Sequence, residues 1–362
     1  MEENSFLEQP NNEETQNDEN QPFVKPSEEH EPQMPYFAYG FTPETYAEKK
    51  GIRRIAAAIG ISFLCISILT YAWAVIYLLF ATKVAHLSYS AAADFVENPA
   101  VQQVMQIVLS ILMFIVPFTI SAKCFGYRID NIVKLSKPVS GTALPLLLFG
   151  IGFCSFSNIA SSQWENIFER LGFEYNVSKT EDPVGVWGFL LTFLATAIVP
   201  ALVEEFAFRG IVLGMLRKYG ETFAIVVSAI TFGIMHGNFE QMPFAALVGL
   251  VLGYICVKTG SIWTSVAVHS VNNAIAVIFS YLTLSSGQNT QNLIYMLYLS
   301  LSILVAIIGI CLLSKQGRDV FSLQKSETAA AEKQKYKWFF TSWVIIVFIV
   351  LNIIDSLAYF VV

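Results

Sequence analysis

The chain has 362 residues, of which 54% are hydrophobic and only 14% charged, and its mean hydropathy is +0.54. Soluble globular proteins contain about 25% charged residues, so the composition excludes that class and indicates a polytopic membrane protein. The net charge of −6 comes from one segment, because residues 1–48 contain twelve acidic side chains against the single Lys25, whereas the remainder is net positive.

Residues 1–48 are predicted to be a disordered acidic tail, since they are rich in Glu, Asn, Gln and Pro and have little apolar surface to bury. Their acidic, polar start does not look like a cleavable signal peptide. Residues 49–362 are expected to form a transmembrane helix bundle. The five cysteines lie singly in apolar stretches, with no spacing typical of a disulfide framework or a metal site.

Nine apolar stretches predict an all-α fold, a polytopic membrane helix bundle of about nine transmembrane helices. The stretches cover roughly residues 55–80, 101–122, 142–160, 187–216, 222–237, 243–257, 261–283, 292–313 and 338–361. The fourth is overlong, and Pro200 is expected to kink it because proline removes a backbone hydrogen bond. The loop 161–186 looks amphipathic and is expected either to lie along the membrane interface or to be a plain connector. Asp355, in the last stretch, is expected to snorkel or to bond a neighbouring helix rather than to act in catalysis.

The distribution of basic residues predicts the orientation. With a cytoplasmic amino terminus, the inner segments contain eighteen lysines and arginines, whereas the outer loops contain only Lys83, Arg170 and Lys179. Cytoplasmic loops of membrane proteins are enriched in such residues. The expected location is therefore the cell membrane, as a multi-pass protein whose amino terminus is cytoplasmic and whose carboxyl terminus, after an odd number of spans, is outside.

The fourth stretch contains Glu204, Glu205 and Arg209 inside a run that is otherwise apolar from Val186 to Leu216. Ionisable groups inside a membrane are costly and usually functional. Glu205 and Arg209 are spaced i, i+4 and can pair on one helix face, whereas Glu204 points about 140° away from Arg209. A paired Glu205 can stay ionised, and the less compensated Glu204 is suited to act as a general base. An ion pair that only joins two helices is the structural alternative.

Three more polar residues lie at a comparable depth. His236 ends the fifth stretch, and His269 and Asn273 share one face of the seventh. At about 1.5 Å per helical residue from the inner boundary, Glu204, His236 and Asn273 lie about 20–22 Å deep and His269 about 16 Å deep. The sequence therefore predicts one site assembled from three helices.

These residues form three motifs in order along the chain. They are Glu204-Glu205-x-x-x-Arg209, Phe232-x-x-x-His236 and His269-x-x-x-Asn273. In this the chain resembles the CPBP family of intramembrane proteases, the group of CAAX prenyl proteases and bacteriocin-processing (Abi) proteins. The resemblance covers about residues 186–283, which would form a CPBP-type protease core within the bundle.

The resemblance implies an intramembrane glutamic endopeptidase that hydrolyses a peptide bond of a membrane-associated or lipid-modified peptide or protein. Glu204 would activate water with the help of His236, His269 and Asn273 would stabilise the oxyanion, and Glu205 and Arg209 would support the site. The expected partners are the lipid bilayer and a peptide or (lipo)protein substrate. No nucleic acid and no cofactor are expected.

Three alternatives remain. Glu204, His236 and His269 are residue types that bind zinc, which would give a zinc-dependent CAAX-type metalloprotease. Their distribution over three helices, without a His-Glu-x-x-His pair, favours a metal-free mechanism. The second alternative is a non-catalytic membrane scaffold or a bacteriocin-immunity or regulatory protein, although no site residue is missing. The third is a transporter, against which no inverted repeat is visible.

Overall fold

The structure is a computed structural model that describes residues 42–361, apart from residues 85, 87, 140, 172–173, 176–182, 285, 318–320, 326 and 359. Most of the expected acidic tail, residues 1–48, lies outside the described residues. The first helix begins at Pro43, so the last residues assigned to that tail are already helical.

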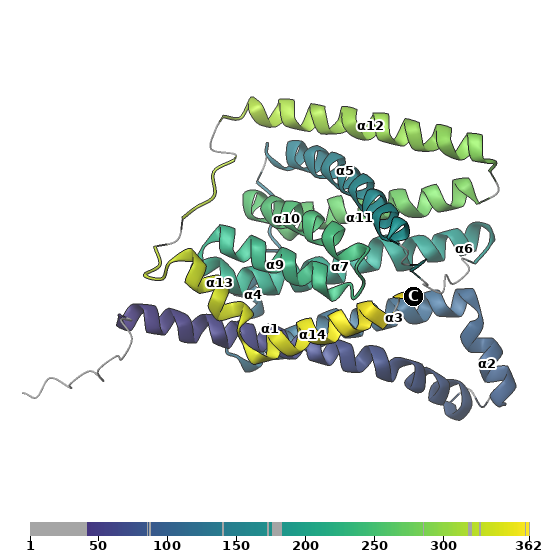
Figure 1. Ribbon diagram of the computed structural model, residues 1–362, viewed down its shortest axis with the longest axis horizontal. Helices are drawn as coiled ribbons and strands as arrows, with labels where there is room; N and C mark the ends of the chain where they lie inside the picture. Colours follow the sequence, from purple (N-terminus) through teal and green to yellow (C-terminus); the bar gives the residue numbers. More distant parts are fainter. Residues whose placement is uncertain are drawn as a thin grey trace, which may run out of the picture. The chain divides into compact units, whose positions relative to one another are not determined.

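Helices make up nearly all of the described chain, which confirms the all-α fold class (Figure 1). The α-helices are α1 (Pro43–Leu79), α2 (Tyr89–Glu97), α3 (Pro99–Cys124), α4 (Ile129–Ile132), α5 (Ala143–Arg170), α6 (Gly185–Thr192), α7 (Val199–Glu205), α8 (Leu213–Leu216), α9 (Glu221–Met235), α10 (Gln241–Thr259), α11 (Ile262–Thr283), α12 (Gln288–Ser314), α13 (Glu332–Phe340) and α14 (Trp343–Ala358). Among the described residues, the only strands are β1 (Glu174–Tyr175) and β2 (Phe360–Val361), which pair antiparallel.

Short π-helical and 3₁₀ turns connect several of these helices. They are η1 (Phe80–Val84), η2 (Phe193–Ile198), η3 (Phe206–Val212) and the 3₁₀ turn η4 (Arg217–Tyr219). The elements from α6 to η4 follow one another without a break, so Gly185–Tyr219 counts as one candidate span of 35 residues. A wider helical turn, η2, lies just before Pro200, and the kink expected at the proline stays a prediction.

Seven helices in the described part of the chain are long and apolar enough to cross a membrane, or eight if α13 and α14 form one bent span. The expected fifth span is α9, whose 15 residues extend only about 22 Å against a hydrocarbon core of about 30 Å. Every expected stretch contains a helix, but nine complete crossings are not confirmed and remain a prediction.

Two stretches differ from the expected boundaries. Helix α5 continues to Arg170, so the amphipathic part of the expected loop 161–186 is the end of a helix. The expected last span, 338–361, is divided between α13 and α14, which meet at an angle of 67°. In α13 the buried Lys335 donates a hydrogen bond to the carbonyl of Tyr219 (2.7 Å). This bond attaches α13 to the end of the Gly185–Tyr219 span, and α13 is not collinear with α14.

Several helices begin at residues that cap them. Thr42, Asn98 and Ser261 each accept a hydrogen bond from a backbone N–H in the first turn of the helix that follows. Gly260, with φ +64°, ends α10 in the left-handed conformation that glycine adopts without strain, and Ser261 starts α11 immediately afterwards. This tight junction fixes the antiparallel pair α10 and α11.

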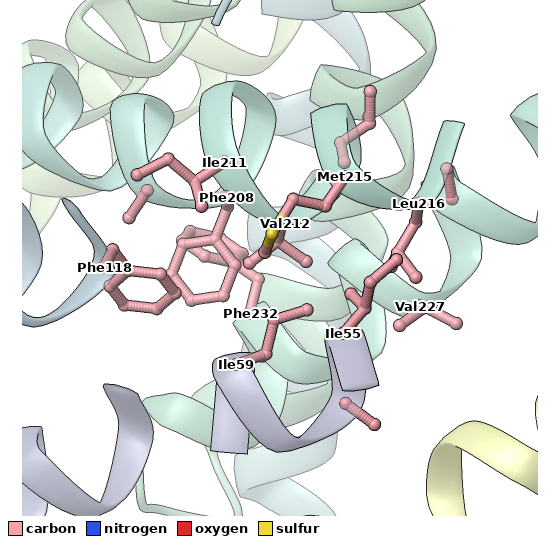
Figure 2. Close-up of a cluster of buried hydrophobic side chains, with 14 of the residues drawn as sticks. Ile55, Ile59, Phe118, Phe208, Ile211, Val212, Met215, Leu216, Val227 and Phe232 are labelled. Carbon is pink, nitrogen blue, oxygen red and sulfur yellow. The ribbon is translucent and has the colours of Figure 1, made fainter. Parts of the chain in front are cut away.

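The centre of the bundle is packed with aromatic and branched side chains (Figure 2). Phe208 of η3 lies at the middle of this core, with its ring 4.9 Å from that of Phe232 on α9 and 5.9 Å from those of Phe63 on α1 and Phe118 on α3. In a bilayer, van der Waals packing rather than burial from water drives helix association. The core therefore holds η3, which contains Arg209, and α9, which leads directly to His236, against α1 and α3.

Candidate active site

The structure brings the predicted site residues to one region of the bundle. Glu204 and Glu205 are the last two residues of α7, and Arg209 lies in η3. His236 directly follows α9, and His269 and Asn273 lie on α11. Helix α11 packs on α7, η2 and η3, and α9 packs on η3.

Glu205 and Arg209 form a fully buried ion pair. The Arg209 Nη1 donates to Glu205 Oε1 at 2.8 Å, and both side chains are 0% exposed. The Arg209 Nη2 also donates to the carbonyl of Gly249 on α10 (3.2 Å), and the guanidinium lies 4.6 Å from the centre of the Phe232 ring. The pairing predicted from the helix period is confirmed, and its contacts extend to α9 and α10.

Glu205 also holds His269. The His269 Nδ1 lies 2.9 Å from Glu205 Oε1, and His269 Nε2 lies 3.9 Å from Glu204 Oε2. Since an ionised carboxylate accepts hydrogen bonds only, His269 donates from Nδ1 and presents Nε2 toward Glu204. The side chain of Glu204 is 14% exposed, compared with 0% for Glu205. Of the two adjacent glutamates, Glu205 is therefore committed to two partners and Glu204 remains accessible.

His236 is oriented by the end of its own helix. Its Nδ1 lies 2.8 Å from the carbonyl oxygen of Phe232, and because a carbonyl only accepts, Nδ1 is the protonated nitrogen. The Nε2 lone pair of the neutral ring is therefore available as an acceptor. The next residue, Gly237, has φ +67°, a conformation that favours glycine and turns the chain out of α9.

A cavity of about 440 Å³ lies beside His236. It is lined by Met235, His236 and Gly237 and by side chains of α1, α3 and α14. A volume of this size is in the range of ligand sites in proteins.

Asn273 is positioned by the backbone carbonyl of Thr196 in η2, to which Pro200 has no N–H to donate. In a regular α-helix the carbonyl of Thr196 would accept from the N–H of residue 200, which proline lacks. The Asn273 Nδ2 instead donates to Thr196 O at 3.1 Å. One N–H of the Asn273 amide is thereby fixed to η2, and the orientation of the second N–H follows from it.

Two residues of this network were not predicted. Asn272 is buried, and its Nδ2 donates to Asn273 Oδ1 (3.3 Å), while its Oδ1 accepts from Asn158 of α5 (3.4 Å). Asn158 also donates to the hydroxyl of Tyr298 on α12 (3.1 Å). The signal in the sequence was an asparagine inside each of two apolar stretches, although nothing in the sequence shows that they meet.

Asp355 accepts a hydrogen bond from the hydroxyl of Tyr71 on α1, which confirms the expected bond to a neighbouring helix. In the described part of the chain, no group of three His, Cys, Asp or Glu side chains is arranged to hold a metal ion. The Nδ1 atoms of His236 and His269 are bonded to Phe232 O and Glu205, which leaves the Nε2 atom of each ring as the one available to a ligand or a substrate.

Comparison with known proteins finds similarity in the segment that contains this site. Residues 186–275 match the family model of the type II CAAX prenyl endopeptidase Rce1-like proteins. The chain is 29% identical over 89 residues to a Bacillus subtilis (strain 168) protein named membrane peptidase YdiL, covering 24% of this chain and 36% of that protein. It is 26% identical over 113 residues to the membrane-embedded CAAX protease MroQ of Staphylococcus aureus (strain USA300), covering 28% of this chain and 46% of that protein. No solved structure matches the chain.

Proposed function

We propose that this chain, which belongs to the CPBP family of membrane proteases through its Rce1-like segment, residues 186–275, is an intramembrane endopeptidase. In this proposal it hydrolyses a peptide bond of a membrane-associated or lipid-modified peptide or protein by means of a glutamate-activated water. The matched parts span less than half the length of the curated relatives. The support for the proposed activity of the whole protein therefore comes from the site residues of this chain.

One observation carries the proposal: the two adjacent glutamates have different surroundings. Glu205 is bonded to Arg209 and His269 and is fully buried, so it supports the site without reaching a substrate. Glu204 is partly exposed and lies next to His269 Nε2. A carboxylate that is accessible, yet surrounded by protein, is suited to take a proton from water.

In the proposed reaction, Glu204 removes a proton from a water molecule, and the water oxygen attacks the carbonyl carbon of the scissile peptide bond. The neutral His236, with Nε2 as acceptor, helps to orient that water. Glu204 then delivers the proton to the leaving amine as the C–N bond breaks. In this proposed reaction atoms and charge balance without a cofactor or a metal ion.

The negative charge on the carbonyl oxygen needs hydrogen-bond donors. We assign this role chiefly to Asn273, because one amide N–H is fixed to Thr196 O and the other is held in a defined direction. His269 Nε2 donates as well when both of its ring nitrogens are protonated, since Nδ1 is committed to Glu205. Removal of one such donor typically lowers the rate by ~10²–10³.

The deciding experiment compares membrane fractions from cells that contain the unaltered protein, Glu204→Gln or Glu169→Gln. Glu204→Gln keeps the shape of the side chain but removes the base, so uncleaved substrates should accumulate with the protein at normal abundance. Glu169, an exposed glutamate at the end of α5, is the matched control and should leave the peptide pattern unchanged. Full activity of Glu204→Gln would remove the protease proposal and leave the scaffold interpretation.

A further inference from the structure

The cavity beside His236 is lined by different kinds of side chain, including polar and acidic ones from α1 and α14. On the side of α9 it is lined by Met235, His236 and Gly237. On the other side α14 contributes Asn352 and Asp355, and α1 contributes Tyr71. Both of these helices lie outside residues 186–275, so the similarity to known proteases does not account for this wall.

Asp355 is the only acidic side chain among the residues that line this cavity, and none of them is a lysine or arginine. It accepts from the Tyr71 hydroxyl, and none of the ion pairs found in the described part of the chain includes it. A carboxylate near the end of a membrane helix without a cationic partner attracts a cation with N–H donors. The cavity therefore combines an acceptor for a positive charge with a wall formed by a proposed catalytic residue.

Asn352 connects the two walls. Its side-chain Nδ2 donates to the carbonyl of Phe348 in its own helix at 2.9 Å, which fixes the amide. Its Oδ1 lies 3.5 Å from the position that a Cβ on Gly237 would occupy. Asn352 of α14 therefore packs against the turn after His236, so Asp355, one turn further along α14, lines the same cavity as His236.

We propose that this cavity is a specificity pocket of the protease, in which Asp355, held by Tyr71, binds a lysine or arginine side chain of the substrate near the scissile bond. The proposal rests on the proposed peptidase function and adds the chemical class of the recognised residue. The apolar lining contributed by Ile66, Met113 and Phe348 suits the aliphatic stem of such a side chain. A lipid ammonium headgroup offers related chemistry, so the assay below excludes ammonium lipids.

The test uses the full-length protein in phosphatidylglycerol vesicles and a proteome-derived peptide library cut after glutamate, so that lysine and arginine remain inside the peptides. Cleavage sites are identified by mass spectrometry. The unaltered protein should prefer a basic residue at one fixed position, and Asp355→Asn should reduce that preference about tenfold or more, the factor expected for a charge-assisted hydrogen bond. Cleavage of peptides without a basic residue should continue in Asp355→Asn.

Two further variants keep the result interpretable. Ala358→Lys puts a cation one helical turn from Asp355 on an exposed position, and should also abolish the basic preference even if Asp355→Asn does not fold. Asp94→Asn, at an exposed carboxylate of α2 outside the cavity, should leave the preference unchanged.

The outcomes separate the two proposals. A basic preference that persists in both Asp355→Asn and Ala358→Lys, or no basic preference in the unaltered protein, overturns the pocket assignment while the peptidase function stands. No cleavage by the unaltered protein at all overturns the proposed function and the pocket with it.

Discussion

At the scale of single residues, the site depends on buried groups that each have several partners. Arg209 is 1% exposed and contacts Glu205, the carbonyl of Gly249 and the face of Phe232. Each of these partners belongs to a different element, α7, α10 and α9. Removal of the guanidinium would therefore leave a buried carboxylate without its cation.

The first prediction concerns this buried pair. Arg209→Met should lower the free energy of unfolding by ~3–5 kcal/mol, because it leaves the charge of Glu205 uncompensated. Thermal unfolding of the purified protein in detergent measures the loss. The control is Arg128→Met, which breaks an exposed pair with Asp130 (75% and 63% exposed) and should change little. A stable but inactive Arg209→Met protein would show instead that Arg209 contacts the substrate.

The second prediction concerns Pro200 and Asn273. Pro200→Ala restores an N–H that competes for the carbonyl of Thr196, so the Asn273 amide should lose its fixed direction. The turnover number should fall, by less than the ~10²–10³ expected for Asn273→Ala, while KM stays similar. Thermal stability should not decrease, since alanine favours a helix. Unchanged turnover in a folded Pro200→Ala protein would contradict the assigned role of Thr196.

The third prediction concerns the proposed unit of Glu204 and His236. His236→Ala should reduce cleavage about as severely as Glu204→Gln, and the double variant should be hardly worse than either, because residues that act together are non-additive. Cleavage by the unaltered protein should also persist with strong chelators. Multiplicative losses in the double variant would indicate that the two side chains act in separate steps.

At the scale of the helices, glycines set how closely neighbours approach. A Cβ on Gly249 of α10 would lie 2.9 Å from the Cα of Ala229 on α9, closer than backbones tolerate. The same glycine provides the carbonyl that accepts from Arg209. Gly249 therefore contributes both to the close contact between α9 and α10 and to the hydrogen bond that holds Arg209 in its ion pair.

The fourth prediction follows from this contact. Gly249→Ala should force α10 away from α9 and lower stability by about 1–3 kcal/mol, the usual cost of overpacking. Activity should fall with it, since the Gly249 carbonyl moves from Arg209. The matched control is Gly287→Ala, where a Cβ has nothing within 4 Å and φ is −67°. Equal stability of the two variants would argue against the role of this packing.

Contacts within one helix could be predicted from the sequence, whereas contacts between distant helices could not. The i, i+4 spacing was enough to predict the pairing of Glu205 and Arg209, because both residues lie in one helical segment. The bond between Glu205 and His269 joins residues 64 positions apart and depends on how α11 is rotated, which periodicity does not give. The bend between α13 and α14 was missed for the same reason, because α13 contacts distant parts of the chain, as in the bond of Lys335 to the carbonyl of Tyr219.

At the scale of the whole molecule, the site helices lie in the middle of the bundle. In Figure 1, α7 and α9 have α10, α11 and α5 on one side and α1, α3 and α14 on the other, and α12 packs outside α5. Depth counting from the sequence placed the proposed catalytic residues at similar levels. It did not predict that helices from both ends of the chain would enclose them.

The fifth prediction concerns the orientation of the whole chain. The eighteen-to-three distribution of basic residues predicts that reporter fusions near Lys134 and Lys325 respond as cytoplasmic and that fusions near Arg170 respond as external. The short helix α9 makes this a direct test of the number of crossings. With Arg170 external, an external signal at Lys325 would show that one of the expected spans between them, such as the short α9, does not cross.

The cavity beside His236 has a consequence for how such a protein changes during evolution. Of the residues proposed to break the bond, His236 lines this cavity, whereas much of the remaining lining comes from α1 and α14, near the two ends of the described chain. Mutations in those outer helices can alter which peptides are accepted while the reaction itself is preserved. Relatives with the same three motifs are then expected to differ in substrate preference more readily than in reaction mechanism.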